Sequence, residues 1–207
     1  MSRKRPSGRR KCGDIRRRTN FRPVRQRFLI VCGGERTEPN YFRHFRAPTV
    51  VITIYAIGKS PLEVVKGAWK CRQEDRRKGE EYDQIWCVFD RDEFLGQDFN
   101  AAIALAHRHH IQVAYSNEAF ELWYLLHFSY QNTAISRRDY ITRLNTLLGH
   151  LYAKNSETMY DELEPRQSEA IRNAERLLAQ YDPPNPAVDN PSTTVHLLVK
   201  ELNRFIR

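Results

Sequence analysis

Short apolar runs alternate with amphipathic stretches along the first 120 residues. The runs are FLIVC (28–32), TVVITIYAI (49–57), QIWCVFD (84–90) and IQVAYS (111–116). Continuous apolar runs of this length are typical of strands that are covered on both faces. Between them, apolar positions at helical spacing predict helices after Thr37, over 61–79 and over 97–109. Strands separated by helices indicate an α/β fold with a mostly parallel sheet flanked by helices.

The first predicted helix has Thr37 as its expected N-cap and buries Tyr41, Phe42 and Phe45. Near the fourth strand, the segment FELWYLLHF (120–128) is apolar almost all round, which predicts a buried helix.

The last third of the chain is predicted to be helical. Helices are expected over 137–152 and 165–181, and a last one begins near Thr193. Four prolines make the segment 182–192 an extended connection. We therefore divide the chain into a basic tail (1–27), an α/β core (28–130) and a helical C-terminal extension packed on that core (131–207).

Positive charge is concentrated in the tail. Residues 1–27 hold twelve Lys or Arg and one acid, whereas the rest of the chain holds 22 basic and 24 acidic residues. The tail has too few apolar residues to offset the entropy of ordering, so we expect it to be disordered in isolation. Its arginines, with Arg16, Arg17 and Arg18 as the densest group, suit an arm that contacts nucleic-acid phosphates. The alternative is a solubilising tail without a specific partner.

Other classes of protein fit the composition poorly. No run approaches the roughly 20 apolar residues of a membrane span, and the basic N-terminus lacks the apolar region of a secretory signal. The four cysteines form no C-x-x-C pair, which argues against a zinc ribbon and a disulfide scaffold. We expect a protein of the reducing cytoplasm that has no membrane association.

Acidic residues follow three of the predicted strands. Glu35 follows the first strand, Asp90 and Asp92 end the third, and Glu118 and Glu121 follow the fourth. The carboxyl ends of parallel strands meet at one edge of a sheet, where ligands bind in open α/β folds. Carboxylates gathered there suit a hard cation such as Mg²⁺, and the alternative is a solvated turn that caps the next helix.

Five ordered motifs make the chain resemble a known family. A glutamate after the first strand and a later D-x-D resemble the Toprim domain of topoisomerases, primases and OLD-type nucleases. More narrowly, the chain resembles the RloB family, Toprim-like proteins of bacterial phage defence that are related to the abortive-infection protein AbiLii. The motifs are CGGERTEPNYF, GKSPLEVV, VFDRDEF, SNEAFELWYLLHF and NPSTTVHLLVKEL.

The resemblance implies roles for individual residues. Glu35 matches the Toprim glutamate that acts as acid/base or metal ligand, and Asp90 and Asp92 match the metal-binding aspartates. Glu121 keeps the family position, while Glu118 stands where SNPCFE or a similar sequence would place proline. The implied cofactor is Mg²⁺ or Mn²⁺.

We therefore expect a metal-dependent nuclease that cleaves RNA, with transfer RNA among the candidates, or DNA, as an effector of anti-phage defence. Glu35, Asp90, Asp92 and Glu121 are its expected catalytic residues. The alternative is a non-catalytic nucleic-acid-binding or adaptor subunit of a defence complex that contains an ATPase, because the family is associated with such partners.

Some basic residues beyond the tail are candidates for nucleic-acid binding. Lys59 and Arg36 lie on the acidic edge, although Lys59 can equally be an ordinary loop lysine. Tyr152 and Lys154 are further candidates for substrate contact.

Overall fold

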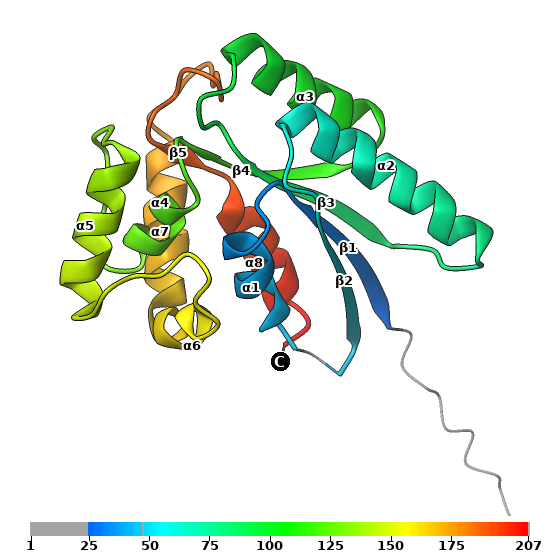
Figure 1. Ribbon diagram of the computed structural model, residues 1–207, viewed down its shortest axis with the longest axis horizontal. Coiled ribbons are helices and arrows are strands. Elements are labelled where there is room, and N and C mark those ends of the chain that lie inside the picture. The colour runs from blue at the N-terminus through cyan, green and yellow to red at the C-terminus, as the bar shows by residue number, and fades with distance from the viewer. Residues whose placement is uncertain (1–24, 47, 207) are drawn as a thin grey trace, which may run out of the picture.

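The computed structural model describes residues 25–46 and 48–206. Its centre is one five-stranded sheet, with the strand order β2-β1-β3-β4-β5 (Figure 1). The strands are β1 (Gln26–Cys32), β2 (Val50–Ala56), β3 (Gln84–Asp90), β4 (Gln112–Asn117) and β5 (Ser192–Thr193). The first four pair in parallel, and β5 pairs antiparallel with β4. The predicted mostly parallel α/β sheet is therefore confirmed.

Strand β1 shows why the apolar runs are continuous. Phe28, Ile30 and Cys32 belong to the core on one face of the sheet, and Leu29 and Val31 belong to the core on the other. Successive side chains of a strand point to opposite faces, so a strand that is covered on both faces is apolar at every position.

Helices cover both faces of the sheet (Figure 1). Helices α2 (Pro61–Arg77) and α3 (Gly96–Arg108) pack together on one face. On the other face lie α1 (Thr37–Arg43), α4 (Glu121–Leu126), α7 (Gln167–Leu178) and α8 (Val195–Asn203). The remaining helices are α5 (Arg137–Leu148), α6 (Met159–Leu163) and the short 3₁₀ helix Glu164–Arg166.

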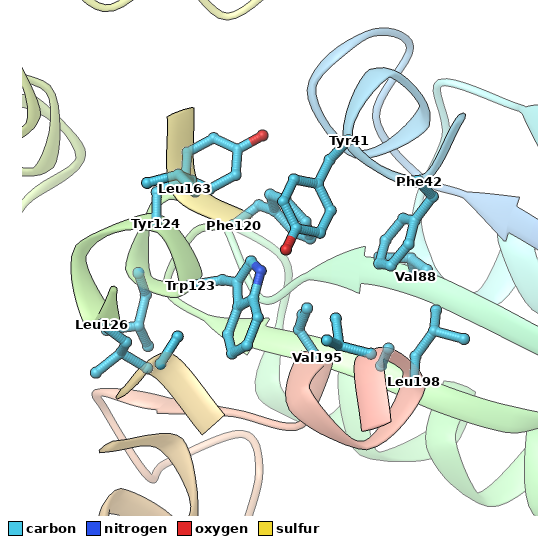
Figure 2. Packing of buried hydrophobic residues seen from close by; sticks show 14 of the residues in the cluster. Tyr41, Phe42, Val88, Phe120, Trp123, Tyr124, Leu126, Leu163, Val195 and Leu198 are labelled. Atoms are coloured by element: carbon cyan, nitrogen blue, oxygen red, sulfur yellow. The ribbon is translucent and has the colours of Figure 1, made fainter. Parts of the chain in front are cut away.

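Helix α4 lies in the middle of the larger core, and all six of its residues are buried. Figure 2 shows Trp123 and Tyr124 of this helix among Tyr41 and Phe42 of α1 and Val195 of α8. The expected buried helix is therefore confirmed. Its position ties the N-terminal part of the chain to the C-terminal helices.

Local details differ from the expectations at three places. Thr37 is not the N-cap of α1: it is the first helical residue, and its hydroxyl donates to the Lys154 carbonyl oxygen, 3.1 Å away. Strand β1 begins at Gln26, inside the segment expected to be tail. Strand β5 was not expected, and α8 begins after it at Val195 because Thr193 pairs with Ser116 in the sheet.

The expected C-terminal extension thus contributes a strand as well as helices. Among the described helices, none has both the length and the apolar character needed to cross a bilayer.

Candidate functional site

A cavity of about 590 Å³ lies at the carboxyl ends of β1 and β3. Its lining includes five carboxylate side chains, namely Glu35, Glu38, Asp90, Asp92 and Glu121. It also includes four basic side chains, namely Arg36, Lys59, Arg137 and Lys154. The parallel topology thus brings together Glu35, Asp90, Asp92 and Glu121, four of the five acidic residues that were predicted to share one edge. The fifth, Glu118, does not line the cavity.

The turn after β3 positions Asp90 and Asp92. Asp90 ends the strand, and the next peptide N–H, that of Arg91, donates to the Ser116 carbonyl oxygen at 2.8 Å. The Asp92 N–H donates to the Glu118 carbonyl oxygen at 3.1 Å. Asp92 has a φ of 44°, a left-handed conformation that aspartate tolerates better than most residues. The end of β4 therefore holds this turn in place.

Arg137 relieves the crowding of these two aspartates. Its Nη2 lies 3.6 Å from Asp90 Oδ2 and 3.1 Å from Asp92 Oδ1. Arg137 is the first residue of α5, whose start is fixed by a capping box between Ser136 and Asp139. The ion pairs are half-buried, and Asp90 Oδ1 is buried without a hydrogen-bond partner in the described structure.

Two further carboxylates lie deeper. Glu38, in the first turn of α1, is 4% exposed, and its Oε1 accepts the Gly34 N–H at 3.1 Å. Glu121, the first residue of α4, is 6% exposed and accepts the Tyr152 hydroxyl at 3.1 Å. These two hydrogen bonds hold the Glu38 and Glu121 carboxylates against the wall of the cavity.

Burial and mutual repulsion perturb these carboxylates. Burial raises the pKa of Glu38 from 4.5 to about 7, and the Glu121 carboxylate adds to the rise. Burial also raises the pKa of Asp90 well above its usual range, with further contributions from Glu38 and Glu121, while Arg137 acts in the opposite direction. Glu38, Asp90 and Glu121 are therefore close enough to interact strongly.

Glu35 and Lys59 lie at the rim of the cavity. Glu35 is exposed and lies against Gly58, where an added Cβ would come within 2.7 Å of Glu35 Oε1. Gly58 has a φ of 64°, a backbone conformation that favours glycine. Lys59 is exposed, and its Nζ lies 3.7 Å from Glu63 Oε1 in the next helix.

The donor set suits a hard cation, since it consists of carboxylate oxygens that include the unpartnered Asp90 Oδ1. Within residues 25–46 and 48–206, however, no three His, Cys, Asp or Glu side chains are grouped closely enough to hold a metal ion together. The expected ligands Asp90 and Asp92 are paired with Arg137 instead. Metal binding by Glu35, Asp90 and Asp92 stays a prediction.

Sequence reasoning missed Glu38 and Arg137. Glu38 has the pattern of an ordinary acidic residue in the first turn of a helix, although its spacing of three from Glu35 offered a weak signal. Arg137 begins a polar amphipathic helix, and nothing in its neighbourhood distinguishes it. Lys154 does line the cavity, as does Arg36, whereas Arg16, Arg17 and Arg18 lie outside the described residues.

Comparison with known proteins gives one match. No curated protein and no solved structure matches the chain. A family model described as RloB-like protein matches residues 28–202, from the first strand to the last helix. All five motifs that suggested the resemblance lie within this range. The match covers well over half of the chain, and the chain therefore belongs to the RloB-like protein family.

Proposed function

We propose that this chain is a metal-dependent nuclease that hydrolyses phosphodiester bonds of RNA or DNA. The observation that carries the proposal is the cavity, which combines five carboxylates with four basic side chains at the ligand-binding edge of a parallel sheet. Such a mixture suits a phosphate group together with a cation. The resemblance to Toprim-like defence proteins supports a role as an effector against phage.

Asp90 and Asp92 would hold Mg²⁺ or Mn²⁺, with Glu121 in support. The bound ion would activate water and neutralise charge on the phosphate. Arg137 now contacts both aspartates, so it has to leave them when a cation binds there. Its guanidinium is then free to contact a phosphate oxygen, a group that arginine binds through two parallel hydrogen bonds.

Other side chains at the cavity would bind the substrate backbone, accept a proton or orient a carboxylate. Lys59 and Lys154 lie on the lining of the cavity and would hold the phosphate backbone through charge. Glu35, exposed at the rim, would accept a proton from the attacking water at its carboxylate. The Tyr152 hydroxyl keeps the Glu121 carboxylate oriented toward the site.

The test is a digestion panel of transfer RNA, single-stranded RNA, duplex DNA and plasmid, with Mn²⁺ and with EDTA. We expect cleavage with Mn²⁺ alone, and a loss of roughly 100-fold or more in an Asp90→Asn/Asp92→Asn variant. Glu93→Gln is the matched control, because Glu93 is exposed on the same turn and does not line the cavity. Full activity of the double variant would refute the assignment.

A second candidate function is a non-catalytic nucleic-acid-binding or adaptor subunit that works with an ATPase partner. The Arg137 contacts favour it, because they already neutralise both aspartates without a cation. In that case the protein binds nucleic acid in the same panel but cleaves none of the four substrates with either Mn²⁺ or Mg²⁺.

A further inference from the structure

We propose that Glu38, rather than Glu35, is the glutamate that completes the cation site with Asp90. This inference rests on the proposed function and names a ligand within it. Glu38 lines the same cavity as Asp90 and is 96% buried, since only 4% of it is exposed. The family motifs indicated Glu35 as the glutamate ligand, whereas the burial of Glu38 favours Glu38 in this role.

The backbone near Gly34 holds the Glu38 carboxylate. The Gly34 N–H donates to Glu38 Oε1 at 3.1 Å. The carboxylate also lies so close to the Gly34 α-carbon that a Cβ at that position would overlap Glu38 Oε2 and Oε1. Glycine therefore makes room for the carboxylate at the foot of the cavity. This main-chain hydrogen bond holds the carboxylate in the cavity wall, and no side chain of the described residues is hydrogen-bonded to it.

A buried carboxylate needs a compensating charge, because removing it from water is costly. Asp90 and Asp92 have Arg137, but no described basic side chain lies within ion-pair distance of Glu38. Asp90 has a second oxygen, Oδ1, that is buried and unpartnered. Glu38, which has no ion-pair partner, and the unpartnered Oδ1 of Asp90 thus line one cavity, and a divalent cation there would supply positive charge to both.

Glu35 has no such need. Its carboxylate is exposed, so water hydrates it whether or not a cation is present. It lies over Gly58 at the rim, between the start of α1 and the turn that leads into α2. A cation that binds only at the rim would leave the buried charge of Glu38 uncompensated.

The experiment is a Mn²⁺ titration followed by thermal unfolding at pH 8, with EDTA as the metal-free reference. Wild type and Glu35→Gln, the matched control, should show the same Mn²⁺ midpoint. Glu38→Gln keeps the shape of the side chain and its acceptor for the Gly34 N–H, and should raise the midpoint at least tenfold. A cooperative melt in EDTA establishes that each variant is folded.

Glu38→Asp provides a second variant, because it keeps the charge but draws the carboxylate back by one methylene. It should also raise the Mn²⁺ midpoint, and calorimetric titration with Mn²⁺ should give the same order of affinities. An unchanged midpoint in both Glu38 variants, or a raised midpoint in Glu35→Gln, overturns the inference alone. Absence of any Mn²⁺ effect on wild type overturns the proposed metal dependence as well.

Discussion

Replacing Glu38 with glutamine should stabilise the metal-free protein above pH 7 and change it little near pH 4.5. The pKa of Glu38 is higher in the folded chain, about 7, than its ordinary value of 4.5. Between these values the folded state binds more protons than the unfolded state, so stability falls as the pH rises. Glutamine has no proton to lose, so this part of the pH dependence disappears.

The size of the effect follows from the shift. One pKa unit corresponds to about 1.4 kcal/mol, so a rise from 4.5 to about 7 corresponds to about 3 kcal/mol. Asp90 interacts with Glu38, so the protonation of Asp90 adjusts when Glu38 is changed, which reduces the net effect. We therefore expect a gain of about 1–3 kcal/mol at pH 8, or roughly 2–10 °C in melting temperature for a chain of this size.

The assay is urea and thermal unfolding in EDTA at intervals from pH 5 to pH 8.5. Glu35→Gln is the control, because it makes the same substitution at a carboxylate of the same cavity that is exposed instead of buried. An equal change in the stability of Glu38→Gln at pH 5 and pH 8, or a loss of stability at pH 8, would contradict this prediction. Either result would mean that the ionised Glu38 carboxylate does not destabilise the metal-free protein.

Three other changes probe the same region and the tail. Arg137→Gln should cost about 1–2 kcal/mol of unfolding free energy in EDTA, because it leaves Asp90 and Asp92 without their cation. It should also lower the Mn²⁺ midpoint in thermal melts by removing a competitor, and a raised midpoint would argue that Arg137 supports the metal. Gly34→Ala should cost about 1–3 kcal/mol in urea unfolding by overlapping the Glu38 carboxylate, and a Glu38→Ala change in the same chain should recover part of this loss. Equal losses in the single and double variants would place the strain elsewhere. Deleting residues 1–24 should flatten the dependence of log K on log salt in nucleic-acid binding, because fewer counterions are released. An unchanged slope in filter binding would mean that the tail makes no phosphate contacts.

The fold was predictable because its signals are local. Each parallel strand is a short apolar run, and each connection contains a helix with apolar positions at helical spacing. The third strand has the bounds that its apolar run predicts, residues 84–90. The two-residue strand β5 had no such signal. It follows a proline-rich connection, and its partner in the sheet, β4, lies 77 residues earlier in the chain.

The candidate site was predictable in part for the same reason. Parallel strands bring their carboxyl ends to one edge, so Glu35, Asp90 and Asp92 were expected together, and all three line one cavity. How deeply each of these side chains is buried was not predictable. Whether Glu35 or Glu38 faces the interior depends on how the loop after β1 turns into α1, and on the space that Gly34 leaves for a side chain.

The sequence by itself determined the α/β class, the family and the acidic edge, because each follows from short local patterns that can be located along the chain without knowing how it packs. Only the tertiary structure decided which side chains and backbone groups meet at this edge. Arg137 reaches Asp90 from a different helix, Tyr152 reaches Glu121 from 31 residues away, and the Lys154 carbonyl meets Thr37 from 117 residues away. Such pairings depend on how the C-terminal helices pack around α4, and no local pattern encodes them.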